Sequence, residues 1–129
     1  MHRTAWGLRV FLAACVVVSG VVHFQRWRTG MRYVDVVGPA FLVNAVAGVV
    51  IGVLLLTWRH WIPLLLAFGF GAATLGAFVV ATSPVGLFGV HSQWQGLAEW
   101  TCAITEALAI VLGPIALVVE RQSAPRVTA

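Results

Sequence analysis

The sequence predicts an all-α, polytopic membrane protein in which four transmembrane helices form a compact bundle with both termini on one side. Three observations support this fold class. The 129-residue chain is 60% hydrophobic and 9% charged, and its mean hydropathy is +0.96, whereas a soluble domain carries about 25% charged residues. Its apolar residues form four long stretches, and its tryptophans lie near the ends of those stretches.

The four apolar stretches are long enough to cross a bilayer, whose hydrocarbon core is about 30 Å thick and needs about 20 helical residues. We expect spans at residues 6–24, 34–58, 62–82 and 97–119. All four belong to a single transmembrane domain, residues 1–129. Proline fits the first turn of a helix, so Pro63 indicates the start of the third span. The tail at 120–129 is predicted to be flexible.

The tryptophans test the predicted span boundaries independently, because this residue is enriched at the interface between the membrane and water. All six lie at or near predicted boundaries: Trp6, Trp27, Trp58, Trp61, Trp94 and Trp100. Between the third and fourth spans, Pro84, Gly86 and Gly89 interrupt any long helix. We therefore expect a loop at 83–96 that lies in the membrane interface or against the bundle.

The arginines predict the orientation, since basic residues favour the cytoplasmic side. The chain has no lysine, and four crossings separate its arginines into two groups. One side holds Arg3, Arg9, Arg59, Arg121 and Arg126; the other holds Arg26, Arg28 and Arg32. This difference predicts a multi-pass protein of the plasma membrane with both termini in the cytoplasm. It also predicts anionic lipid head groups as the partners of the arginines, and no nucleic acid, because the basic residues form no continuous face.

Enzymatic activity is not predicted. Four spans leave no room for a separate catalytic domain, and the sequence has no nucleophile elbow, Walker motif, zinc-protease motif or dinucleotide fingerprint. The two cysteines, Cys15 and Cys102, have no metal-binding spacing and are interpreted as small buried hydrophobic residues. Only five residues separate Arg9 from Cys15, too few for the apolar core of a lipoprotein signal.

Small residues at a spacing of four predict where helices pack, since close approach in lipid depends on glycine and alanine. The second span has Gly48 and Gly52, and Asn44 lies one turn earlier on the same face. The third span has Ala72 and Gly76, with a parallel pair at Ala73 and Ala77. The pattern does not indicate whether the packing partner belongs to the same chain.

The polar residues within the spans are candidates for function. A carboxylate near the bilayer centre costs at least about 2.5–3.5 kcal/mol, so Glu106 is expected to face the bundle interior, a cavity or a partner. Desolvation favours its protonated form unless a cation pairs with it. Glu99 and Cys102 lie on the same helical stripe. We expect Asn44, also near mid-span, to be the hydrogen-bond partner of Glu106.

Two histidines are predicted to lie at the same end of the bundle. The topology places His23, His91 and Glu99 on one face, where they are weak candidates for metal ligands or a proton relay. His60 and His2 fall at the opposite face, so a haem held by two facing histidines is a weaker alternative. We predict no cofactor.

Three segments of the chain resemble segments of known membrane proteins. They are Ser19-Gly20-Val21-Val22-His23, the run from Gly38-Pro39-Ala40 to Ala47-Gly48, and Gly86-Leu87-Phe88-Gly89. The chain resembles small four-helix membrane proteins of high-GC Gram-positive bacteria and is similar in layout to DoxX-like proteins. The shared motifs are packing motifs, so the resemblance implies a layout and no particular activity.

Three hypotheses follow for function. The preferred one is a non-enzymatic subunit or accessory partner of a membrane complex, assembled with other membrane proteins or with itself. The second is a small proton-coupled transporter or channel in which Glu106 titrates. The third is a haem- or metal-binding redox component.

Overall fold

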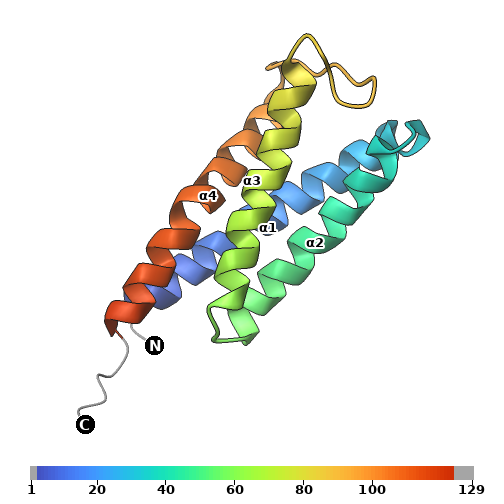
Figure 1. The fold of residues 1–129 in the computed structure, drawn as a ribbon. Coiled ribbons are helices and arrows are strands. Elements are labelled where there is room, and N and C mark those ends of the chain that lie inside the picture. The colour runs from blue at the N-terminus through green and yellow to red at the C-terminus, as the bar shows by residue number, and fades with distance from the viewer. Residues whose placement is uncertain (1–2, 124–129) are drawn as a thin grey trace.

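The computed structural model describes residues 3–123, with the backbone alone for Ser123. Its elements are α1 (Arg3–Thr29), the 3-10 helix η1 (Met31–Tyr33), α2 (Val37–Thr57), α3 (Ile62–Thr82) and α4 (Leu97–Ser123) (Figure 1). Each α-helix is long and apolar enough to cross a membrane. The predicted fold class, a four-helix membrane bundle, is confirmed, and the start of α1 lies beside the end of α4 (Figure 1).

The helix bounds refine the predicted spans. The third span was predicted to the residue, because Pro63 occupies the first turn of α3. The first predicted span lies inside the longer α1, and α2 starts three residues later than predicted. The fourth helix is longer than the predicted span, because residues 120–123 of the predicted tail continue α4; residues 124–129 lie outside the described part of the chain.

The bundle consists of two closely packed helix pairs. α1 packs along α2 and α3 packs along α4, and the pairs meet mainly where α1 contacts α4, while α2 and α3 touch much less (Figure 1). The α1–α2 contact uses the predicted glycines. Gly48 lies directly against the Val16 carbonyl and Gly20, and Gly52 lies against Val17, so a side chain at either position would collide.

The small residues of α3 do not all face the bundle. Gly71 lies against the Glu106 carbonyl and Ala109 of α4. Ala72 and Gly76 are exposed, and a Cβ added at Gly76 would meet nothing within 4 Å. The predicted packing role of Ala72 and Gly76 is therefore not met by any described part of this chain.

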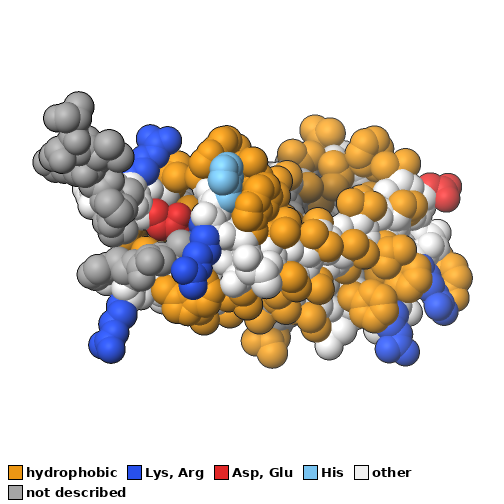
Figure 2. Space-filling model, turned by 90° about the horizontal axis from the view of Figure 1, so that it is seen from below, with side chains coloured by type: hydrophobic (Ala, Val, Ile, Leu, Met, Phe, Trp, Pro, Cys, Tyr) orange, Lys and Arg blue, Asp and Glu red, His pale blue; other side chains and the backbone are white. Residues whose placement is uncertain are grey.

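The outer surface is that of a membrane protein. Large apolar side chains cover the sides of the helices, as on the outer face of α2, where Val43, Val46 and Val53 are each more than half exposed. Charged side chains gather toward the two ends of the body, and its middle is largely hydrophobic (Figure 2). In water such a surface would drive aggregation, whereas lipid chains cover it without penalty.

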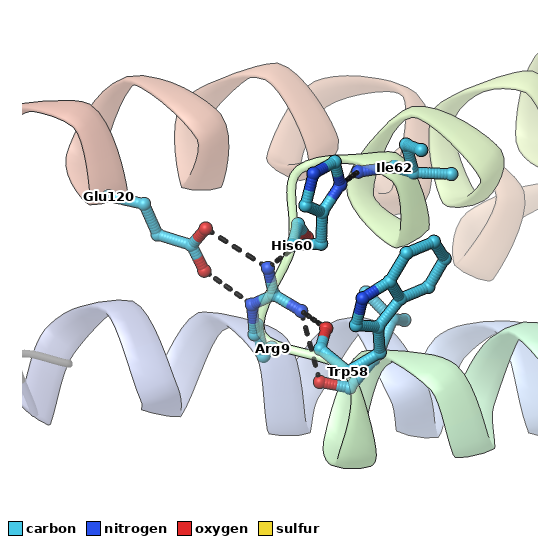
Figure 3. A network of polar contacts seen from close by, with 6 residues as sticks. Arg9, Trp58, His60, Ile62 and Glu120 are labelled. Atoms are coloured by element: carbon cyan, nitrogen blue, oxygen red, sulfur yellow. Dashed lines mark hydrogen bonds and ion pairs between the residues drawn. The ribbon is translucent and has the colours of Figure 1, made fainter.

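The end of the bundle that holds the start of α1 is closed by one arginine. Arg9 is completely buried. Its guanidinium donates to the carbonyls of Leu55 at 3.2 Å and Trp58 at 2.9 Å, to the carbonyl of His60, and through two nitrogens to the carboxylate of Glu120 (Figure 3). An arginine has five side-chain N–H groups, and all of them have an acceptor here.

This arginine network performs three structural tasks. It pairs with α4 through Glu120, it satisfies carbonyls at the end of α2 that have no partner within the helix, and it holds the α2–α3 connector (Figure 3). A cation at a helix C-terminus also interacts favourably with the helix dipole. We call this end, with Arg9, Glu120 and the connector 58–61, the closed end.

The opposite end carries the longer loop, 83–96, which is a loop as predicted. Its turns use positive φ angles at Gly86, Phe88 and Gly89, and Leu87 pairs with Val90 through backbone hydrogen bonds. Trp94 contacts Phe78 of α3 and Trp100 of α4, with ring centroids 4.7 and 5.1 Å apart. The loop therefore packs back onto the ends of α3 and α4.

Candidate functional site

A cavity of about 110 Å³ lies at the end of the bundle opposite the arginine network. All four helices, η1 and the 83–96 loop contribute to its wall. Its polar lining residues are His23, Arg26, Thr74, Ser92, Glu99, Cys102 and Glu106. Apolar residues such as Phe41 and Phe78 complete the wall. We call this cavity the pocket.

Glu106 forms the deep end of the pocket. It is 1% exposed, and the Ser19 hydroxyl of α1 donates a hydrogen bond to its Oε1 at 3.0 Å. Ser19 is itself completely buried. Among the described residues, no arginine or histidine forms an ion pair with Glu106. A buried carboxyl with one hydroxyl donor is stable when protonated or when a bound cation compensates its charge.

The prediction that Asn44 is the partner of Glu106 is wrong. The Asn44 amide donates to the Thr74 hydroxyl of α3 at 2.7 Å, and Thr74 donates to the Phe70 carbonyl at 2.7 Å. Asn44 lies on α2, which makes no close contact with α4, so its amide reaches α3 and not Glu106. The Asn44 Oδ1 atom is buried and has no hydrogen-bond partner within residues 3–123.

His23 and Cys102 lie next to Glu106. The His23 Nδ1 atom is 2.8 Å from the Ser19 carbonyl oxygen, so in this arrangement Nδ1 carries a proton and donates it. The same nitrogen is 3.8 Å from the Cys102 Sγ atom. One ligand atom from each of His23, Cys102 and Glu106 lies within 4.8 Å of the others. The ring of His23 rests against Phe41, with centroids 4.9 Å apart.

An ion pair marks the mouth of the pocket. Arg26 of α1 donates to Glu99 of α4 at 2.7 Å, and their side chains are 46% and 23% exposed. Such an exposed pair contributes about 0–1 kcal/mol, so it opens at little cost. The second carboxylate oxygen of Glu99 is buried without a hydrogen-bond partner among the described residues. The mouth therefore combines an easily broken contact with an unused acceptor.

The predicted metal candidates are only partly brought together. His23 and Glu99 both line the pocket. His91 does not; it is exposed and lies against Gly86 within its own loop. His60 belongs to the closed end, where its ring stacks on Trp58, and His2 is outside the described residues. The predicted trio of His23, His91 and Glu99 is thus replaced by His23, Cys102 and Glu106.

Two residues were not predicted from the sequence in the roles that they have in the structure. Cys102 was not predicted to line a site, and Arg9 was not predicted to lie in the interior. A signal for the pocket was present: Ser19 and His23 are four residues apart on one helix, and Cys102 and Glu106 are four residues apart on another. Residues at this spacing share a helical face. Two such polar pairs in apolar helices indicate two faces that meet.

Comparisons with known proteins do not indicate what the pocket binds. No family model, no curated protein and no solved structure matches the chain. The volume of the pocket limits which ligands it can hold. A haem or another drug-sized molecule needs about 300 Å³ or more, whereas this cavity has the volume of about three to four water molecules at roughly 30 Å³ each.

Proposed function

We propose that this protein is a non-enzymatic, multi-pass membrane protein that takes a small cation into its pocket from one face of the membrane. The observation that carries the proposal is Glu106, a buried carboxyl at the inner end of an accessible cavity, with a hydroxyl partner and no ion pair in the described chain. In a low-dielectric environment such a carboxyl is neutralised by a proton or by a bound cation, and the cavity beside it gives a cation access.

The charges around the pocket support a cation over an anion. Two carboxyls, Glu99 and Glu106, and one guanidinium, Arg26, line it. Arg26 is bound to Glu99 at the mouth, which leaves Glu106 as the uncompensated acid. The cavity volume of about 110 Å³ restricts the ligand to an ion with a few waters or to a molecule of a few heavy atoms.

The closed end supports binding over conduction. Below the pocket the helices are filled by tightly packed apolar residues, among them Leu12, Leu55, Leu64 and Ala67, which are at most 1% exposed. The Arg9 network, whose contacts Figure 3 draws, then closes that end of the bundle. An ion that crossed the bundle would have to displace both layers. Proton-coupled transport through Glu106 stays a prediction that needs a second conformation.

The two cysteines provide a test of the proposal. Cys102 lines the pocket, whereas Cys15 is 5% exposed and lies in the packed part of α1. In the Cys15→Ser variant, reconstituted in nanodiscs, a small cationic methanethiosulfonate should modify Cys102, and an anionic reagent of similar size should react more slowly. In the matched Cys102→Ser variant, Cys15 should stay unmodified. Equal inertness of the two cysteines, or equal rates with both reagents, would overturn the proposal.

The location of the protein is part of the proposal. The excess of arginine at the closed end favours cytoplasmic termini in a plasma membrane, so that the pocket opens to the outside. Membrane-impermeant cationic reagent added to intact cells should then modify Cys102. Modification in inverted vesicles alone would reverse the orientation.

A role as a subunit or accessory partner is a second candidate, and the outer face of α3 favours it. Gly69, Ala72, Ala73 and Gly76 are all exposed along one side of this helix, and small residues permit close helix contact in lipid. Blue native electrophoresis after mild extraction should show a species larger than the monomer, and Gly76→Leu should reduce it to the monomer. Migration of the unaltered protein as a monomer would count against this role.

A further inference from the structure

The inner wall of the pocket contains three side chains of different chemistry that converge from two helices. His23 comes from α1, and Cys102 and Glu106 come from α4. Their ligand atoms lie within 4.8 Å of one another. An imidazole nitrogen, a thiol sulfur and a carboxylate oxygen are the three ligand types that zinc and neighbouring transition metals accept together.

We propose that His23, Cys102 and Glu106 form a binding site for a divalent transition-metal ion of the zinc type. This inference rests on the proposed function, because the ion would enter through the same pocket, and it names the class of cation. Calcium and magnesium prefer sets of oxygen ligands, so a site with sulfur and nitrogen discriminates against both.

The distances are compatible with ligation. Bond lengths of 2.0–2.3 Å around a tetrahedral ion place ligand atoms about 3.5 Å apart. The His23 Nδ1 and Cys102 Sγ atoms are already 3.8 Å apart. The largest separation in the set, within 4.8 Å, needs a contraction of about 1 Å, which rotation of the long Glu106 side chain can supply.

The charge balance fits a site inside a membrane. Ligation needs the thiolate of Cys102 and the carboxylate of Glu106, and any protons that they carry are released to water. Two negative ligands and one doubly positive ion give a centre with no net charge. A neutral centre avoids the penalty of an isolated charge in low dielectric, which a monovalent or trivalent ion at the same ligands would retain.

A second set of contacts positions these ligands. The Ser19 hydroxyl donates to the Glu106 carboxylate at 3.0 Å, and the Ser19 carbonyl accepts from His23 Nδ1 at 2.8 Å. Outer contacts of this kind orient metal ligands. If the Nε2 atom of His23 binds the ion, Nδ1 still donates to the Ser19 carbonyl. If Nδ1 binds the ion, it gives up the proton of that hydrogen bond. Three protein ligands leave the fourth tetrahedral position to water in the pocket.

Cobalt(II) is the probe for this site, because a cobalt–thiolate bond gives an intense near-ultraviolet charge-transfer band. The full chain without an affinity tag, in nanodiscs, should bind one equivalent of Co²⁺ with this band, and Zn²⁺ should abolish it. Cys102→Ser should remove the band, and the control Cys15→Ser should retain it. Ser19→Ala should lower Co²⁺ affinity by about 10–100-fold through loss of the outer contact. Unchanged thermal melting in nanodiscs without metal would show that Ser19→Ala still folds.

The outcomes separate this inference from the proposed function. If Cys102 reacts with the cationic thiol reagent but Co²⁺ gives no band, the metal site is wrong and the pocket proposal stands. If Cys102 is inert and Co²⁺ gives no band, both are wrong. A band that persists in Cys102→Ser, or one that Ser19→Ala leaves unchanged in affinity, also overturns the metal site.

Discussion

Two acids on α4 show how differently the two ends of this bundle are built. Glu120, at the closed end, meets the guanidinium of Arg9, and every donor of that arginine is used. Glu106, at the pocket end, has the hydroxyl of Ser19 as its hydrogen-bond partner within residues 3–123. Both acids receive their partner from α1, but the first partner carries a full positive charge and the second does not.

The two ends therefore have different roles in the molecule. A charge that is paired and fully hydrogen-bonded contributes to holding the fold, and removal of either member is strongly destabilising. A carboxyl with one neutral donor and a cavity beside it is available to an incoming ion. We therefore interpret the closed end as structural and the pocket end as the part of the bundle that can take up an ion.

The largest effect is expected from Arg9→Met. Methionine fills part of the volume but removes the guanidinium that donates to Glu120 and to the carbonyls of Leu55, Trp58 and His60, so stability should fall by about 3–5 kcal/mol. Unfolding in mixed micelles, followed by tryptophan fluorescence as the fraction of SDS rises, measures this loss. Arg3→Met, an exposed substitution on the same helix, is the control and should change little. Equal effects of the two variants would show that the network is not structural.

A smaller effect is expected from the helix contact that supports both ends. In Gly48→Ala the new methyl group would overlap the Val16 carbonyl, which forces α1 and α2 apart and should lower stability by about 1–3 kcal/mol. Gly76→Ala is the matched control, since nothing lies within 4 Å of its added methyl. The same mixed-micelle titration compares them. Destabilisation by Gly76→Ala alone would mean that α3, and not the α1–α2 contact, carries the close packing.

Backbone strain at the pocket end predicts a modest gain. Val36 has φ 65° and ψ −56°, and the Val37 amide donates to the Asp35 carbonyl at 2.7 Å, which defines a strained γ-turn before α2. A β-branched residue rarely adopts positive φ. Val36→Gly should relieve the strain and, after the entropy cost of glycine, stabilise the protein by about 1 kcal/mol. Val43→Gly, at an exposed site within α2, should instead destabilise.

The smallest effect on stability is expected where the pocket itself is changed. Glu106→Gln keeps the shape and a hydrogen bond with Ser19, so the unfolding free energy without metal should change by no more than about 1 kcal/mol. Binding of Co²⁺ should be lost in the same variant, because the site loses a charged ligand. A collapse of stability like that of Arg9→Met would make Glu106 a structural residue and remove the contrast between the ends.

How far the sequence predicts this molecule depends on the range of each interaction. Hydropathy and the position of Pro63 are local, and they predict the four spans and the bounds of α3. The GxxxG pair at Gly48 predicts close packing, although the partner, Gly20 on α1, required the structure. Arg9 and Glu120 are 111 residues apart, so neither the burial of the first nor the helical state of the second follows from local pattern.

The site could be predicted only in part, because some of its contacts are local in the sequence and others are not. The sequence indicates that Glu106 faces the interior and that His23 and Glu99 share an end, and both residues line the pocket. It does not indicate that α2 and α4 make no close contact with each other, which is why Asn44 bonds Thr74 and not Glu106. Cys102 and His23 are 79 residues apart and have no motif spacing, so only the packing of α1 on α4 reveals them as neighbours.

Two positions on one face of α3 test the contrast between the ends most directly. Thr74 lines the pocket, and Ala67, two turns earlier and about 10 Å away along the helix, is completely buried in the packed core. In a background of Cys15→Ser and Cys102→Ser, Thr74→Cys and Ala67→Cys are compared for reaction with a water-soluble thiol reagent in sealed proteoliposomes. Thr74→Cys should react from one side of the membrane only, and Ala67→Cys should not react. Equal rates at the two positions, or reaction of Thr74→Cys from both sides, would contradict this contrast.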